Sequence, residues 1–241
     1  NDRLRDNRFV ILPGIELSVS FPVLGTGTCA SAHLLLIFAP LTEPQHIHAA
    51  IREASGKHWD FGSILTLDDL PLFVKGIRHH SNYPAICIAA HVGSDKGVRE
   101  EAKNCILDYL EAEISRLEGV LADPDTPDRD SIQQQLQECK QRHTDTEHVS
   151  LEVLHLLGLC GFDALQTRGP RDQTYYRRLH RFREEQGRSV SIICSDAHRI
   201  QDIFCYSDSE DTQKLIPFTK LSTLSTPIEP RELFLELRDK G

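Results

Sequence analysis

Short apolar runs alternate with helical patterns along most of this 241-residue chain. The apolar runs lie at 8–20, 33–38, 85–90, 163–167 and 189–195, and the clearest helical patterns lie at about 42–54, 66–77 and 172–186. Repeated strand–helix alternation is typical of parallel strands that are covered by helices. The pattern therefore predicts an α/β protein, built as an open sheet or as a barrel.

Residues 98–149 interrupt this alternation. Apolar residues recur every three or four positions from Ala102 to Leu121, as on one face of an amphipathic helix. A turn-rich stretch, ADPDTPDRD, then leads to a second and more polar helix, SIQQQLQECKQRH. We expect a helical hairpin that is inserted between strands and packs on the host domain. A coiled-coil surface for a partner is the alternative.

The composition narrows the classes of protein to consider. No apolar run approaches the roughly 18 residues that a membrane-spanning helix needs, so we expect no membrane association. The seven cysteines are dispersed without a CxxC pair, which argues against a disulfide framework and a zinc–thiolate site and predicts a reducing cytoplasm. The net charge of −9 argues against indiscriminate binding of nucleic acid.

Positive charge is nevertheless concentrated in residues 168–188, which contain seven arginines and only three acidic residues. Such a segment can follow a phosphate backbone, with Tyr175 and Tyr176 stacking on the bases of a single strand. The alternative is a solvated amphipathic helix, because Tyr175, Leu179 and Phe182 have the spacing of its buried face.

Side chains that ligate metals occur at the boundaries of four separate runs. Glu16 follows a Pro-Gly turn in LPGIEL, His33 opens HLLLIF, and His91 ends ICIAAH. Asp196 and His198 follow the last run, in CSDAH. Strand ends meet at one face of an α/β barrel, so we expect these side chains to converge. Imidazoles and carboxylates ligate Zn²⁺, Mn²⁺ and Fe²⁺. Taken alone, each residue is more typical of a solvated turn glutamate or of a structural histidine, and it is the set of residues together that favours a metal site.

The motifs LPGIEL, HLLLIF, AAHVGS and CSDAH resemble, in order and approximate spacing, those of the PHP (polymerase and histidinol phosphatase) domain. The resemblance covers most of the chain, which would form one domain over residues 1–241 with 98–149 as an insertion. It implies a distorted (β/α)7 barrel that binds two or three divalent metal ions, Mn, Zn or Fe, and hydrolyses phosphoesters.

The resemblance also implies a role for each candidate ligand. Glu16 matches the bridging carboxylate, and His33 and His91 match two ligands of one metal. Asp196 matches a ligand of the neighbouring metal, and His198 matches a ligand of the third. Glu16, His91 and Asp196 are then the expected catalytic residues.

The chain departs from the PHP pattern near its start, where PHP domains carry an HxH strand end. His46 and His48 have the HxH spelling, but they lie in a helical pattern after the glutamate motif. The chain also contains no methionine. We therefore expect an internal fragment whose barrel is incomplete at the N-terminus, with the HxH motif upstream; loss of the motif is the alternative. In addition, Gln166 stands where the family often has a carboxylate.

A narrower resemblance is carried by AAHVGSDKGV and by the ending FTKLSTLSTPIEPRELFLEL. Both look like PHP domains fused to an SMC/ABC-like ATPase, a group that includes bacterial proteins implicated in antiphage defence. No GxxxxGK[ST] motif occurs in the chain, so the ATPase is expected elsewhere in the full protein. Residues 206–241 would be an extension toward that domain.

These resemblances imply a cytoplasmic, metal-dependent phosphoesterase, a nuclease acting on DNA or RNA, that can form a homo-oligomer. Lys96, Arg168 and Arg171 are the candidate residues for binding the phosphate substrate. Three alternatives remain open: a catalytically degenerate PHP scaffold, a small-molecule phosphatase, and a hydrolase of the amidohydrolase type.

Overall fold

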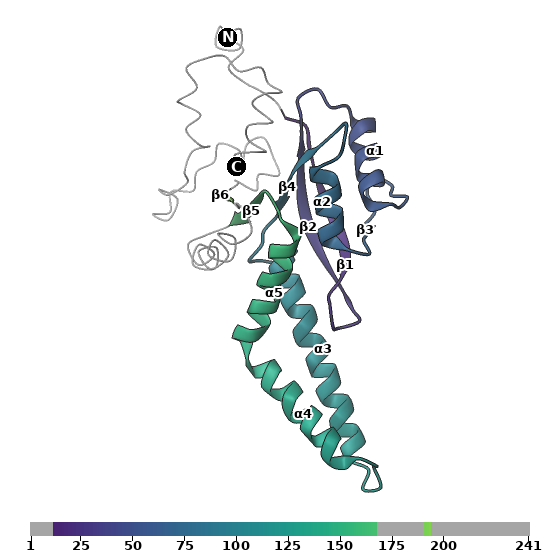
Figure 1. The fold of residues 1–241 in the computed structure, drawn as a ribbon, viewed down its shortest axis with the longest axis vertical. Helices are drawn as coiled ribbons and strands as arrows, with labels where there is room; N and C mark the ends of the chain where they lie inside the picture. The colour runs from purple at the N-terminus through teal and green to yellow at the C-terminus, as the bar shows by residue number, and fades with distance from the viewer. Residues whose placement is uncertain (1–11, 168–189, 194–241) are drawn as a thin grey trace.

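The computed structural model describes residues 12–167 and 190–193 of the chain (Figure 1). Its strands are β1 (Gly14–Pro22), β2 (Cys29–Phe38), β3 (Leu65–Thr66), β4 (Ala85–Ala89), β5 (Ala164–Thr167) and β6 (Val190–Ile193). Its helices are α1 (Pro44–Ser55), α2 (Leu70–Arg78), α3 (Val98–Leu121), α4 (Arg129–Thr144) and α5 (Thr146–Cys160). The helical pattern at 172–186, the arginine-rich segment and the extension at 206–241 lie outside the described residues.

The described strands form one mixed sheet in the order β3-β1-β2-β4-β5-β6. Strand β2 runs antiparallel to both β1 and β4, whereas β1 pairs in parallel with β3, and β4, β5 and β6 are mutually parallel. The α/β class is thus confirmed, but the expectation of parallel strands throughout is wrong for β1, β2 and β4. Residues 23–28 are too short a connection for the crossover that a parallel β1–β2 pair would need.

Strands β1 and β2 alternate strictly between a buried and a partly exposed face. Leu17 pairs with Leu34 on the buried face, and Val19 and Phe21 follow with the period of two that a strand imposes. The opposite face carries Glu16, Ser18 and His33. The hydrophobic core therefore determines which face of the sheet presents the candidate ligands.

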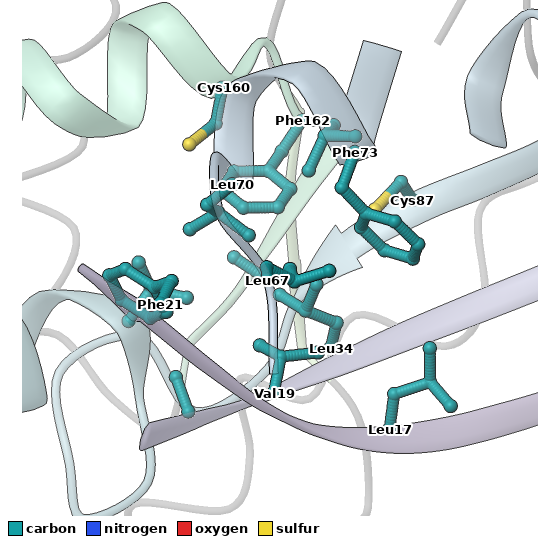
Figure 2. Packing of buried hydrophobic residues seen from close by; sticks show 14 of the residues in the cluster. Leu17, Val19, Phe21, Leu34, Leu67, Leu70, Phe73, Cys87, Cys160 and Phe162 are labelled. Atoms are coloured by element: carbon teal, nitrogen blue, oxygen red, sulfur yellow. The ribbon is translucent and has the colours of Figure 1, made fainter. Parts of the chain in front are cut away.

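The buried face packs against the helices α1 and α2. Figure 2 shows Leu17, Val19 and Leu34 of the hairpin in one cluster with Phe73 of α2, and Phe162, which precedes β5, belongs to the same core. Fully burying one such side chain contributes roughly 1.5–3 kcal/mol. The core thus joins the N-terminal hairpin to the segment that follows α5.

Helices α3 and α4 form the expected hairpin, which extends away from the sheet in Figure 1. The first turns of α3 bury Ala102, Ile106 and Leu110 in the core, so the base of the hairpin packs on the host domain as expected. Farther out, the ion pairs Lys140–Glu118 and His143–Glu111 connect the two helices. The expected boundary at residue 149 falls inside α5.

Within the described residues, no helix is both long enough and apolar enough to cross a membrane.

Asp163 connects α2, β4 and β5 through a buried carboxylate. Its Oδ1 lies 2.5 Å from Arg78 Nη2, and its Oδ2 accepts a hydrogen bond from the Cys87 amide at 2.8 Å. Arg78 also donates to the Gly161 carbonyl at 2.6 Å. Both carboxylate oxygens of Asp163 are thus paired, which holds the start of β5 beside β4.

Helix α2 depends on a side-chain cap at its first turn. Asp69 accepts a hydrogen bond from the Leu72 amide at 2.8 Å, and Pro71 occupies the first turn, where its missing N–H costs nothing. The substitution Asp69→Ala should lower the free energy of unfolding by about 1 kcal/mol in urea titrations. The neighbouring Asp68→Ala removes only an exposed ion pair to Lys57 and should change it by less than about 0.5 kcal/mol. Equal effects of the two substitutions would contradict this cap.

Burial raises the pKa of the Cys87 thiol well above its usual value, and Asp163 and Cys160 raise it further, while Arg78 opposes them. A thiol must ionise to react with an alkylating reagent. Brief treatment of the native protein with iodoacetamide at pH 8 should therefore label the exposed Cys29 and leave Cys87 unmodified, as read by peptide mass spectrometry. Labelling of Cys87 at the rate of Cys29 would contradict its burial.

Candidate metal centre

The β1–β2 register brings Glu16 next to His33. Glu16 pairs directly with Leu35, and Ser18 pairs with His33, so Glu16 and His33 are diagonal neighbours on one face of the antiparallel pair. Diagonal side chains in such a pair are close enough for long residues to touch. The carboxylate Oε1 of Glu16 accordingly lies 2.5 Å from Nδ1 of His33.

His91 joins these two residues from a turn at the end of β4. The main chain of His91 has a φ of 45°, in the left-handed region that few non-glycine residues adopt. Its side chain is only 8% exposed, and its Nε2 lies 3.9 Å from Oε1 of Glu16. The ring centroids of His33 and His91 are 5.9 Å apart. Three residues from three strands or strand ends therefore meet at one point.

The loop from His91 to Gly97 is tied to β2 by main-chain hydrogen bonds. The His33 amide donates to the Lys96 carbonyl at 2.7 Å, and the Ala90 amide donates to the His33 carbonyl at 3.2 Å. The Ser94 amide donates to the His91 carbonyl at 2.8 Å. These bonds fix the position of His91 relative to His33 through the backbone, independently of the side chains.

The geometry fits a metal ion held by one carboxylate and two imidazoles. The three ligand atoms lie within 4.8 Å of one another, close to the roughly 4.4 Å that can separate two ligands each about 2.2 Å from a common ion. Nδ1 of His33 is buried and has no hydrogen-bond partner among the described residues, because its contact with Glu16 lacks hydrogen-bond geometry. A buried nitrogen this close to a carboxylate oxygen needs a cation between them, either a proton or a metal ion.

The donor set also indicates how such an ion would be used. Two histidines and one glutamate are a set found in catalytic zinc sites, which leave at least one coordination position for water or substrate. The Glu16 side chain is 40% exposed, whereas that of His33 is 26% exposed. The group is therefore accessible to solvent from the Glu16 side.

Three of the five expected ligands, Glu16, His33 and His91, are brought together by the structure, whereas Asp196 and His198 lie outside the described residues. One detail of the expectation was wrong: His33 lies in the middle of β2, not at its start. Glu16 likewise lies within β1, so the group forms across an antiparallel hairpin.

The expected substrate-binding residues are placed only in part. Lys96 lies in the loop that follows His91, with an exposed side chain and a φ of 64°. Arg168 and Arg171 lie outside the described residues. The structure thus places one candidate cation on the loop that carries a candidate ligand.

Sequence reasoning missed the residues that support His91. Gln166 was read only as a departure from a family pattern, yet its side-chain Oε1 accepts a hydrogen bond from the His91 amide at 3.3 Å. Ser94 Oγ donates to the His91 carbonyl at 3.2 Å. A glutamine in an otherwise apolar run such as ALQT was the available signal, because a buried amide needs a partner.

Comparisons with known proteins identify no relative: no family model, curated protein or solved structure matches the chain.

Gly97 is required by the close approach of the loop to His91. A Cβ atom at this position would lie 2.1 Å from the His91 carbonyl oxygen and 2.8 Å from that of Ser94. We expect Gly97→Ala to lower the free energy of unfolding by about 2–4 kcal/mol, since both neighbours are backbone and cannot move away freely.

The matched control is Gly119→Ala in α3, where an added Cβ meets nothing within 4 Å. Alanine in a helix interior is favoured over glycine by roughly 0.5–1 kcal/mol, so this variant should be as stable as the wild type or more stable. Urea titrations of both variants make the comparison. Wild-type stability of Gly97→Ala would mean that the loop does not pack against His91 as described.

Proposed function

We propose that the chain is a metal-dependent phosphoesterase, specifically a nuclease, whose metal centre is formed by Glu16, His33 and His91. The observation that carries the proposal is the convergence of these three ligand atoms within 4.8 Å. Support also comes from the order of the motifs around them, which resembles that of PHP domains.

A divalent ion held in this way would activate water near neutral pH and polarise a phosphoryl oxygen. His33 and His91 hold the ion through neutral imidazole nitrogens, and Glu16 is committed to the same task and is not free to act as a base. The exposed Glu16 side of the group would give a phosphodiester access to an ion held there. Lys96, on the loop that follows His91, is the proposed partner for a non-bridging phosphate oxygen.

The proposal extends to features that the PHP resemblance implies. It includes closure of the sheet into a distorted (β/α)7 barrel, binding of a second or third ion with Asp196 and His198 as ligands, and contacts of Arg168 and Arg171 with substrate. It also includes the setting of the chain within an ATPase-coupled antiphage defence protein.

Metal binding and hydrolysis test the proposal together. Metal analysis of the purified chain, before any chelator is used, should give about one equivalent or more of Mn, Zn or Fe. The chain should hydrolyse bis(p-nitrophenyl) phosphate or single-stranded DNA after loading with Mn²⁺. His33→Ala and Glu16→Gln should each lower metal affinity and turnover by more than about 100-fold, because a lost ligand costs more than a lost outer-shell partner.

His58→Ala is the matched control, since His58 is an exposed histidine that pairs with Asp60 outside the group. It should retain metal content and turnover. Equal metal content in His33→Ala and wild type would place the ion elsewhere and overturn the proposed centre. Tight metal binding without hydrolysis of any phosphoester would overturn the catalytic part of the proposal.

A further inference from the structure

We propose that Gln166 is a positioning residue that holds His91 in the orientation required for metal binding. The inference rests on the proposed function in one respect, which is that His91 ligates the ion. It goes beyond that function by assigning a role to a residue that ligates nothing and that a metal-binding motif would not include.

Gln166 contacts the His91 turn at two successive amides. Its side-chain Oε1 accepts from the His91 N–H at 3.3 Å, and its main-chain carbonyl accepts from the Val92 N–H at 3.2 Å. The residue lies in β5, beside the end of β4, and is only 2% exposed. One buried residue thus bonds to the backbone of a candidate ligand and to that of the next residue.

The His91 turn needs such support because its backbone is strained. Strand β4 ends at Ala89, so the His91 amide has left the regular ladder of the sheet, and the φ of 45° is unfavourable for a side chain with a Cβ. Strained non-glycine residues persist where the surrounding structure holds them, and they cluster at functional sites. Gln166 satisfies the His91 amide on one side, while Ser94 satisfies the carbonyl on the other.

The side chain acts here through its acceptor oxygen, which makes the chemistry testable by substitution. Gln166→Met has a similar length but no acceptor, so the buried His91 N–H would lose that hydrogen bond. Gln166→Glu keeps an acceptor at the same reach, although it replaces the buried amide with a carboxyl group. Gln166→Asn keeps the amide but is shorter by one methylene, so it should fall short of His91 while disturbing the core less than methionine.

The hydrogen-exchange rate of the His91 amide, measured in the metal-free 241-residue chain, tests directly whether Gln166 holds this residue. Loss of the side-chain acceptor in Gln166→Met should speed exchange of the His91 amide by about tenfold, the equivalent of one ordinary hydrogen bond. The Val92 amide is an internal control, because its acceptor is the main-chain carbonyl that every variant retains. Unchanged exchange at His91 in both Gln166→Met and Gln166→Asn would overturn the proposal.

The effect on metal binding is measured as the affinity of each variant for Co²⁺, followed by the visible absorption of the bound ion. Gln166→Met and Gln166→Asn should bind Co²⁺ about 10–100-fold more weakly than the wild type, as is usual when an outer-shell partner is lost. Gln166→Glu should lose less affinity than Gln166→Met, because it keeps an acceptor for the His91 amide. Wild-type affinity in the methionine and asparagine variants would overturn the proposal.

Failure of the proposed function gives a different pattern. If the wild type and His33→Ala bind Co²⁺ equally poorly, the metal centre is wrong, and the exchange rates at His91 still decide whether Gln166 positions that residue. A methionine variant that fails to fold leaves the asparagine variant to carry both measurements.

Discussion

The antiparallel register of β1 and β2 is the constraint on which the candidate site depends. Side chains alternate across a strand, so a slip of one residue would turn His33 into the core and Leu34 toward Glu16. Leu17 and Leu34, directly opposite each other in the buried face, resist that slip through the apolar surface they bury. The placement of Glu16 beside His33 is therefore a consequence of hydrophobic packing on the other side of the sheet.

The third candidate ligand is held by a different kind of constraint. His91 lies in a left-handed turn that is stabilised by backbone bonds, by Gln166 and by the close approach of Gly97. Gln166 is in turn placed by β5, whose start is anchored to β4 through the Asp163 carboxylate. A local strain at the site is thus compensated by buried polar groups that belong to the fold.

The sequence allowed a good part of the site to be predicted, but not its architecture. Glu16, His33 and His91 were identified because imidazoles and carboxylates beside apolar runs have a known chemistry. Their convergence was expected at the ends of parallel strands, whereas Glu16 and His33 meet across an antiparallel hairpin. The sequence could not distinguish the two arrangements, because side chains alternate with a period of two in both kinds of sheet. The role of Gln166 depends on a contact between residues 75 positions apart, which no local pattern encodes.

X-ray absorption spectroscopy of the Zn²⁺-loaded chain tests the central claim most directly, because it reports the ligand types around the ion. The account predicts two imidazole ligands in the first shell together with oxygen ligands at about 2.0–2.2 Å, and loss of one imidazole contribution in His33→Ala. A shell of thiolate sulfur at about 2.3 Å, or a histidine count that His33→Ala leaves unchanged, would contradict it.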